Sequence, residues 1–321
     1  MHTSPPSCDP VTKRVFIVNP HAARGAVGKN WPQIRDLAEK HLGGFKSFVT
    51  AAPGEATQFA RLAVSQGAQS VVCVGGDGTL NEVINGLMNE EGPRNPDVHI
   101  GFIPNGTGCD FRKTLLIPTN PEDALKVIEG GRTRPIDLGR LRYVDHNGET
   151  RTRYFHNLTS FGLGGEVDER VNTSGKKLGG FLSFIIATLV SLVLYEKKSI
   201  RLRVDDHFDE EVAVLNVAVA NGQYHGGGMW VAPGANPSDG LFHVTIIGEL
   251  SLPEVFYYLP KLYNGKILQV KRVRSVTGKK VEAFSDARVL LDVDGEQPGC
   301  LPVKIEIVPS ALRILGPETR P

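Results

Sequence analysis

Hydrophobic positions in residues 1–131 follow two alternating patterns. Short runs rich in β-branched residues, which are typical of buried strands, lie at residues 15–18, 45–49, 71–74 and 98–103. Between them stand amphipathic segments, of which residues 80–87 are the clearest, with apolar side chains at positions i, i+3, i+4 and i+7. Strands that alternate with helices predict a parallel sheet covered on both faces. We therefore expect a Rossmann-like α/β domain over residues 1–131.

From residue 132 onward, strand-like runs dominate the pattern. The runs at 136–144 and 152–158 flank residues 145–148, which include an Asn-Gly pair typical of a β-hairpin turn. Further runs of this kind lie at residues 200–204, 212–220, 241–247, 289–293 and 303–308. We predict a mainly antiparallel β domain over residues 132–308, which makes the fold class α/β plus β.

Composition narrows the classes of protein that fit. The 321 residues include 40% hydrophobic side chains, which is enough for two ordinary cores. A net charge of +1 gives no strong long-range electrostatic attraction to nucleic acid, so no nucleic-acid partner is expected. Four scattered cysteines without CxxC spacing argue against a disulfide framework or a zinc site. The first ten residues lack the pattern of a signal peptide, so we expect a cytoplasmic protein.

A glycine turn separates the strand at 71–74 from the amphipathic segment after it. Gly75 and Gly76 let the backbone turn and approach a ligand closely. The N–H groups that open the next helix carry partial positive charge, which favours a phosphate. Asp77 is unusual there, because a carboxylate is repelled by phosphate unless a cation or a transferable proton lies between them. The turn indicates a nucleotide phosphate held with Mg²⁺, although many such turns only connect a strand to a helix.

The stretch Gly-Gly-Asp-Gly-Thr, followed by Asn81 and Glu82, resembles the signature of the diacylglycerol kinase catalytic domain superfamily. This superfamily includes diacylglycerol kinases, sphingosine kinases and bacterial lipid kinases of the YegS and DgkB type, and the more distant NAD kinases share the GGDG core. The resemblance runs from Val15 to about Val308 and rests on four separated motifs. It implies a nucleotide domain followed by a β-sandwich-like domain, with the active site in the cleft between them. In some relatives the chain end returns to the first domain, which is our expectation for residues 309–321.

The resemblance also implies which residues contact ATP. Relatives carry a loop with Asn-Pro, glycine and basic residues, and a threonine at the end of the next strand. A second loop, residues 104–111, resembles the family's P-x-G-T-x-N-D-F motif, with Cys109 where asparagine is usual. The residues so assigned to the nucleotide and its Mg²⁺ are Asn19, Arg24, Lys29, Thr50, Gly75, Gly76, Asp77, Gly78, Thr79, Leu80, Asn81, Gly106, Thr107 and Asp110.

Two of these assignments have plainer alternatives. Arg24 and Lys29 also fit a solvated turn with two surface cations. Asp110 also fits a cap for a helix that begins at Phe111. The occurrence of two glycine-acid loops at consecutive strand ends favours the functional interpretation of Asp110.

The sequence offers three candidates for a general base. A lipid hydroxyl must lose its proton as it attacks the γ-phosphate, and a carboxylate within hydrogen-bond reach can accept that proton. The Asp294-Gly295-Glu296 unit resembles the family motif whose acids are implicated in this step, so Asp294 is our first choice and Glu296 our second. Asp77 is a rival, because related sphingosine kinases are thought to use the aspartate of the first loop. Asp292, two residues earlier, is expected to face solvent.

A structural Mg²⁺ site is implied by the segment at residues 236–241, which resembles the A-x-x-x-D-G-L segment of bacterial relatives. The resemblance assigns the carboxylate of Asp239 and the backbone oxygens of Asn236 and Leu241 to the ion. Oxygen ligands suit a hard divalent cation. The alternative is an ordinary β-turn with aspartate before glycine.

Two segments bear on the acceptor. Leu178–Tyr195 contains no charged residue, and we interpret it as a buried or partly exposed helix packed on the β domain rather than as a membrane span. The functional form of this interpretation is a helix that walls a cleft for acyl chains. Lys266–Lys280 contains six cations and no acid. A solvated face is the plain interpretation, and transient docking on anionic lipid is our hypothesis. Near the cleft, Asn157, Gly162 and Gly164 resemble the family's N-x-x-x-x-G-x-G segment.

Together these observations predict an ATP- and Mg²⁺-dependent lipid kinase that transfers the γ-phosphate of ATP to a lipid hydroxyl at a membrane surface. Diacylglycerol, ceramide, sphingoid base, monoacylglycerol and phosphatidylglycerol all remain candidate acceptors. The alternatives are a NAD-kinase-like phosphotransferase and a non-catalytic lipid or nucleotide sensor. A homodimer is a further expectation, because bacterial relatives often pair.

Overall fold

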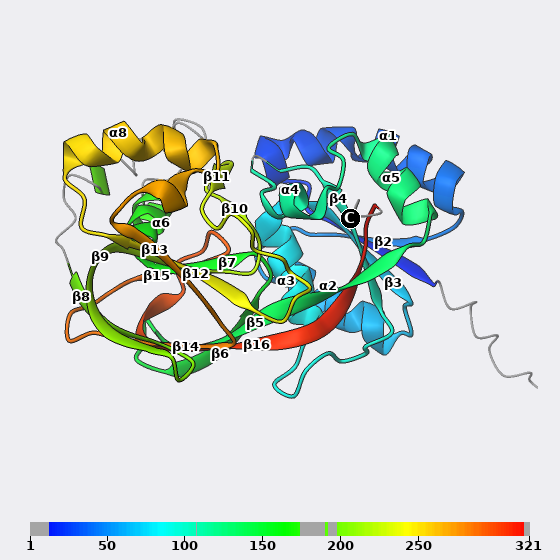
Figure 1. The fold of residues 1–321 in the computed structure, drawn as a ribbon. Helices are drawn as coiled ribbons and strands as arrows, with labels where there is room; N and C mark the ends of the chain where they lie inside the picture. Colours follow the sequence, from blue (N-terminus) through cyan, green and yellow to red (C-terminus); the bar gives the residue numbers. More distant parts are fainter. Residues whose placement is uncertain (1–12, 107, 174–189, 192–197, 318–321) are drawn as a thin grey trace, which may run out of the picture.

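The computed structural model describes residues 13–106, 108–173, 190–191 and 198–317, and Figure 1 shows their arrangement. Two of the sequence predictions concern residues outside these ranges: Thr107, and most of the apolar segment 178–195. Within the described residues, none of the helices has both the length and the apolar character needed to cross a membrane.

The N-terminal domain is built on four parallel strands in the order β4–β3–β1–β2. These strands are β1 (Arg14–Val18), β2 (Lys46–Val49), β3 (Ser70–Gly75) and β4 (His99–Pro104). Its helices are η1 (Ala22–Gly25), α1 (Ala26–Leu42), α2 (Glu55–Ser65), α3 (Asp77–Leu87), α4 (Phe111–Leu115) and α5 (Pro121–Glu129). The predicted parallel α/β domain is confirmed.

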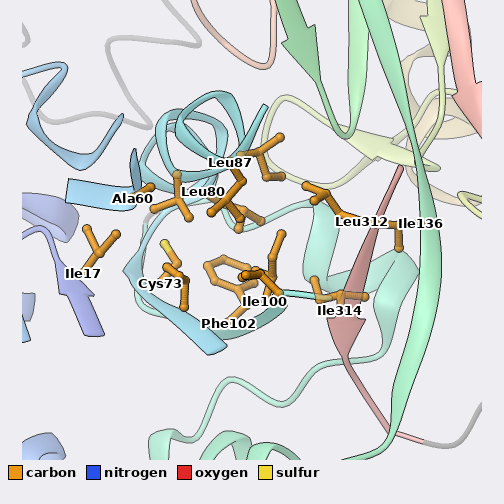
Figure 2. Packing of buried hydrophobic residues seen from close by; sticks show 14 of the residues in the cluster. Ile17, Ala60, Cys73, Leu80, Leu87, Ile100, Phe102, Ile136, Leu312 and Ile314 are labelled. Atoms are coloured by element: carbon orange, nitrogen blue, oxygen red, sulfur yellow. The ribbon is translucent and has the colours of Figure 1, made fainter. Parts of the chain in front are cut away.

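Successive side chains of each strand point to opposite faces of this sheet and form two apolar layers, one on each face. Ile17, Cys73 and Phe102 point toward the face covered by α2 and α3, where Leu80 is fully buried, as Figure 2 shows. Phe16 and Val72 belong to the opposite layer, which α1 and α5 cover. Burial of strands on both faces explains why their sequences are continuously apolar.

The C-terminal domain is dominated by antiparallel strands, as predicted. Its longer strands are β5 (Thr133–Asp145), β6 (Thr150–Phe155), β7 (Leu158–Gly162), β8 (Lys198–Val204), β9 (Phe208–Ala220), β12 (Phe242–Gly248), β13 (Val273–Gly278), β14 (Lys280–Phe284) and β16 (Gly299–Leu315). The short elements are β10 (Tyr224–His225), β11 (Met229–Trp230), β15 (Leu291–Val293) and η2 (Ile267–Gln269). Among the described residues, α6 (Leu163–Thr173) and α8 (Leu252–Tyr263) accompany them, and a separate apolar core fills this domain.

The last strand, β16, connects the two domains. It pairs with β5 along most of its length, and its residues Arg313 and Ile314 pair in parallel with β4. In Figure 1, β5 and β16 run together from one domain into the other. Leu312 and Ile314 belong to the apolar cluster of the N-terminal domain, so the chain end holds the two domains on one continuous sheet.

The strand that the sequence pattern predicts over residues 152–158 is interrupted between β6 and β7. The break falls at His156 and Asn157, whose backbone N–H groups donate to the carboxylate of Asp294, with N···O distances of 3.0 and 3.1 Å. Leu158 donates its N–H to the same carboxylate at 3.0 Å. A side chain distant in sequence therefore ends β6 by taking N–H groups that a continuous strand would use in the sheet.

Candidate active site

The first glycine turn lies against the second one. A Cβ added to Gly106 would come within 2.5 Å of the Cα of Gly76, and one added to Gly75 would come within 2.7 Å of Oγ1 of Thr79. No real Cβ tolerates such distances, so the close approach of the two loops requires glycine at position 106, and the contact between Gly75 and Thr79 within the first loop requires glycine at position 75. The α3 helix begins at Asp77, directly after this contact, so its N-terminus opens at the junction of the loops.

A cavity of about 450 Å³ lies over this junction. Six of the residues assigned to the nucleotide line it: Asn19, Thr50, Gly76, Gly78, Thr79 and Gly106. Nδ2 of Asn19 donates to Oγ1 of Thr79 at 2.9 Å, which fixes both side chains at the rim of the loop. The cavity size and the helix N-terminus at its base fit the phosphates of a nucleotide.

Seven other assigned residues that the structure describes do not line the cavity: Arg24, Lys29, Gly75, Asp77, Leu80, Asn81 and Asp110. Arg24 and Lys29 are exposed and do not line the cavity. Leu80 is buried in the apolar core. Asn81 is buried beneath the loop and faces the C-terminal domain, where its Nδ2 donates to Oδ2 of Asp294 at 2.7 Å.

Asp77 of the first glycine loop and Asp110 of the second have carboxylates that accept hydrogen bonds from different parts of the chain. The carboxylate of Asp77 accepts the N–H of Asp110 at 2.8 Å, and burial is the main cause that raises its pKa. The carboxylate of Asp110 lies 2.7 Å from Nζ of Lys113 and accepts the N–H of Gly227, from the other domain, at 2.8 Å. Asp110 occupies the N-cap position of α4, as the plainer alternative requires, but its side chain makes no capping hydrogen bond.

Cys109 replaces the usual asparagine without opening the loop. Its Sγ accepts the N–H of Gly106 at 3.1 Å and lies 3.8 Å from the carbonyl oxygen of Gly75. Burial raises the pKa of this thiol to about 12, so it stays protonated and can donate to that carbonyl. Cys109 thus joins the two glycine loops, as an amide side chain could.

Asp294 is buried and accepts hydrogen bonds on both oxygens. Besides the three backbone N–H groups at residues 156–158, it accepts from Asn81, and Nδ1 of His156 lies 2.7 Å from its Oδ2. Although burial alone would raise its pKa, the nearby His156 and these hydrogen bonds lower it to about 2. A carboxylate with so low a pKa, enclosed by its donors, is a weak proton acceptor. This geometry argues against the sequence-based choice of Asp294 as general base.

Glu296 has the opposite environment. Its side chain is about half exposed (46%), lies 2.5 Å from Nη2 of Arg153, and lines the 450 Å³ cavity from the C-terminal domain. A Cβ added to Gly78 of the first loop would lie 4.0 Å from its Oε1. Glu296 therefore faces the phosphate loop across the domain junction. It also lines a neighbouring polar cavity of about 650 Å³.

The segment assigned to a structural Mg²⁺ forms a hydrogen-bonded turn. Oδ1 of Asp239 accepts the N–H of Leu241 at 3.0 Å, and Oδ1 of Asn236 accepts the N–H of Ser238 at 3.2 Å. Oδ2 of Asp239 lies 3.9 Å from Nε2 of His243. Among the residues that the structure describes, no group of three or more His, Cys, Asp or Glu side chains is arranged to hold a metal ion. The oxygen atoms of the turn are suitable ligands for Mg²⁺. A structural Mg²⁺ at this turn stays a prediction.

An apolar cavity of about 160 Å³ lies in the C-terminal domain, outside all of the predicted nucleotide contacts. The aliphatic and aromatic side chains that line it come mainly from α6, β9 and one face of α8, and include Val167, Leu215, Tyr258 and Leu262. Asp292 lies at its wall and is 1% exposed, so the prediction that it faces solvent is wrong. The reason is that β15 pairs with β7 inside the domain, which turns Asp292 toward Ser160.

Sequence reasoning missed several residues of this region. Arg153, His156, Lys113 and His225 all contact acids of the predicted motifs. Their partners are distant in sequence, except for Lys113, which lies one helical turn after Asp110. That spacing was the one signal that could have identified a contact in advance.

Comparisons with known proteins agree with this architecture. Residues 13–141 match the family model described as the diacylglycerol kinase catalytic domain, and residues 157–316 match the YegS C-terminal NAD kinase beta sandwich-like domain. A diacylglycerol kinase of Staphylococcus carnosus is 28% identical over 306 residues, which cover 94% of each chain. A Xanthomonas euvesicatoria protein named "probable lipid kinase YegS-like" is 32% identical, over 85% of this chain and 87% of that one. The crystal structure of a diacylglycerol kinase from Bacillus anthracis has the same fold, with a TM-score of 0.71 at 22% identity, over 95% of this chain and 97% of that one.

Proposed function

This chain belongs to the diacylglycerol kinase catalytic domain family, and from that premise we propose that it transfers the γ-phosphate of ATP to a hydroxyl group of a lipid. The observation that carries the lipid assignment is the apolar cavity beneath α8. A kinase with a small polar acceptor has no need of such a cavity, whereas an acyl chain is stabilised there by burial of its methylene groups.

In this proposal the phosphates of ATP bind at the junction of the two glycine loops. The N-terminus of α3 and the backbone of Gly76 and Gly106 would contact them, and Asn19 and Thr79 would orient the γ-phosphate. Mg²⁺ bound with ATP would supply positive charge against the phosphates. Asp77 and Asp110 are the carboxylates that would hold this ion or its water, and its charge would also keep Asp77 ionised despite the burial that raises its pKa.

Glu296 is the general base that the geometry favours. It projects from the C-terminal domain toward the phosphate loop, and its half-exposed carboxylate can reach a hydroxyl that lies above Gly78. The lipid oxygen would form a bond to the γ-phosphorus while the bond from that phosphorus to the bridging oxygen of ADP breaks. The hydroxyl proton would pass to Glu296, and ADP would leave with the displaced electron pair. Arg153 would hold the carboxylate in position.

The test is transfer of radiolabelled γ-phosphate from ATP and Mg²⁺ to diacylglycerol in mixed detergent micelles. We expect Glu296→Gln to lower kcat by at least about a hundredfold, because a positioned base contributes on the order of 10²–10⁴. ATP binding by the same variant, measured by calorimetry, should be unchanged. A variant that transfers phosphate as fast as the wild type would exclude Glu296 as the base.

The NAD-kinase-like alternative has its own supporting observation. The polar cavity of about 650 Å³ that Glu296 also lines includes Arg151 and Arg153, which could contact a dinucleotide acceptor. The two acceptors are distinguished by supplying both to the same reaction. Label on NAD alone would support the dinucleotide acceptor and refute the lipid acceptor.

A further inference from the structure

The apolar cavity ends at a cluster of polar side chains that the phosphoryl transfer does not use. Ser160, His225 and Asp292 line it together with the aliphatic residues. Oδ2 of Asp292 accepts a hydrogen bond from Oγ of Ser160 at 3.1 Å and lies 2.9 Å from Nε2 of His225. Oδ1 of Asp292 accepts the N–H of Gly295 at 2.8 Å. The carboxylate is therefore fixed in one orientation at the wall of the cavity.

This cluster lies at the end of the cavity that is nearest to the phosphate loop. His225 is two residues from Gly227, so the Cα atoms of His225 and Gly227 lie within about 7 Å of each other. The N–H of Gly227 donates to the carboxylate of Asp110. Asp292 directly precedes the tight turn that ends at Glu296 and is closed by the hydrogen bond from the N–H of Val293 to the carbonyl oxygen of Glu296 at 2.8 Å. An acyl chain in the cavity would thus place its polar end between the cluster and the transferred phosphate.

The chemistry of the cluster restricts the headgroup that fits. A carboxylate in apolar surroundings is a strong hydrogen-bond acceptor and attracts hydroxyl or ammonium donors. A phosphate needs cations to replace its hydration, and none of the described residues that line the cavity is a lysine or an arginine. An anionic headgroup would meet the negative charge of the Asp292 carboxylate at the wall of the cavity.

We propose that Asp292, His225 and Ser160 form the headgroup subsite for the lipid acceptor, which accepts a hydrogen bond from a hydroxyl or amine and excludes anionic headgroups. This inference rests on the proposed lipid kinase function and narrows its substrate class. Uncharged or cationic lipids with a free donor, such as diacylglycerol, monoacylglycerol, ceramide or a sphingoid base, fit the subsite. Phosphatidylglycerol does not.

The experiment measures KM and kcat for diacylglycerol, ceramide, a sphingoid base and phosphatidylglycerol in mixed micelles, with the wild type and three variants. For Ser160→Ala, His225→Gln and Asp292→Asn we expect at least a tenfold rise in KM for the uncharged or cationic acceptors. The KM for ATP should stay unchanged. Asp292→Asn should also reduce the discrimination against phosphatidylglycerol, because it removes the negative charge. Ser285→Ala is the matched control, since its hydroxyl also donates one hydrogen bond, to the carbonyl oxygen of Ser199 at 2.8 Å, but Ser285 does not line the cavity.

Ser160→Ala and His225→Gln keep the test informative if Asp292→Asn fails to fold. Unchanged acceptor KM in both variants would overturn the subsite, as would a wild type that phosphorylates phosphatidylglycerol as efficiently as the uncharged lipids. A wild type that phosphorylates none of these lipids would refute the proposed function, and the subsite with it. The two failures are therefore distinguishable.

Discussion

Replacement of Asp294 by asparagine tests whether the carboxylate of this residue stabilises the fold or acts in catalysis. The carboxylate accepts three backbone N–H groups and the Nδ2–H of Asn81, divided between its two oxygens. Asparagine keeps the shape but offers one acceptor oxygen, so its NH₂ group must face donors on the other side. At least two buried donors then lose their acceptor, at about 1–3 kcal/mol each, and we expect a loss of about 4 kcal/mol in the free energy of unfolding.

A loss of this size lowers the melting temperature by about 6 °C in a protein of this length. Thermal unfolding followed by circular dichroism measures it, and ATP binding at low temperature shows that the nucleotide site survives. Glu296→Gln is the contrasting variant, because a half-exposed ion pair with Arg153 contributes only about 0–1 kcal/mol. We expect its melting temperature to change by no more than about 3 °C while phosphate transfer is lost. An Asp294→Asn protein that melts like the wild type but transfers no phosphate would refute this account and return Asp294 to the role of base.

Three further predictions follow from single features. Because the native pKa of Asp294 is about 2, below the ordinary value of 3.8, its ionised form contributes stability, on the order of 2 kcal/mol, that is complete above about pH 4 and lost as pH falls toward 2. Acid titration of stability should therefore be flatter for Asp294→Asn than for the wild type. Gly106→Ala forces a Cβ to within 2.5 Å of the Cα of Gly76 and should weaken ATP binding at least tenfold by calorimetry, whereas Gly44→Ala, with no atom within 4 Å, should not. Replacement of Lys271, Arg272 and Arg274 by glutamine should weaken binding to anionic vesicles about tenfold. This is less than three unpaired cations would give, because Arg272 already lies 3.5 Å from Glu254 and Arg274 lies 2.9 Å from Glu210. Unchanged binding would exclude docking through this segment.

The parts of the fold that the sequence predicts are those set by local pattern. The runs at 15–18 and 71–74 are buried on both faces, so they are continuously apolar and easily identified as parallel strands. The hairpin at 145–148 follows from its Asn-Gly turn. The glycine loops are equally local, and the structure brings both to the same cavity.

The residues that the sequence misjudges depend on contacts between distant segments. An Asp-Gly pair after a strand is typical of an exposed turn, yet Asp292 and Asp294 are both buried because β15 pairs with β7, more than a hundred residues earlier. The donors that satisfy Asp294 come from the break after β6, which itself exists because of Asp294. No local pattern contains this mutual dependence. The same holds for Asn81, whose side chain is directed by Arg153 and Asp294 rather than by a nucleotide.

The most direct test of the central claim is transfer of radiolabelled γ-phosphate from ATP and Mg²⁺ to an extracted mixed-lipid pool, with NAD present as a water-soluble competing acceptor. Asp77→Ala and Glu296→Gln serve as inactive controls. We expect label in an organic-extractable product that disappears in both variants. Label only on NAD would contradict the lipid acceptor in favour of the dinucleotide, and ATP binding without transfer to either would contradict a kinase activity and support a sensor.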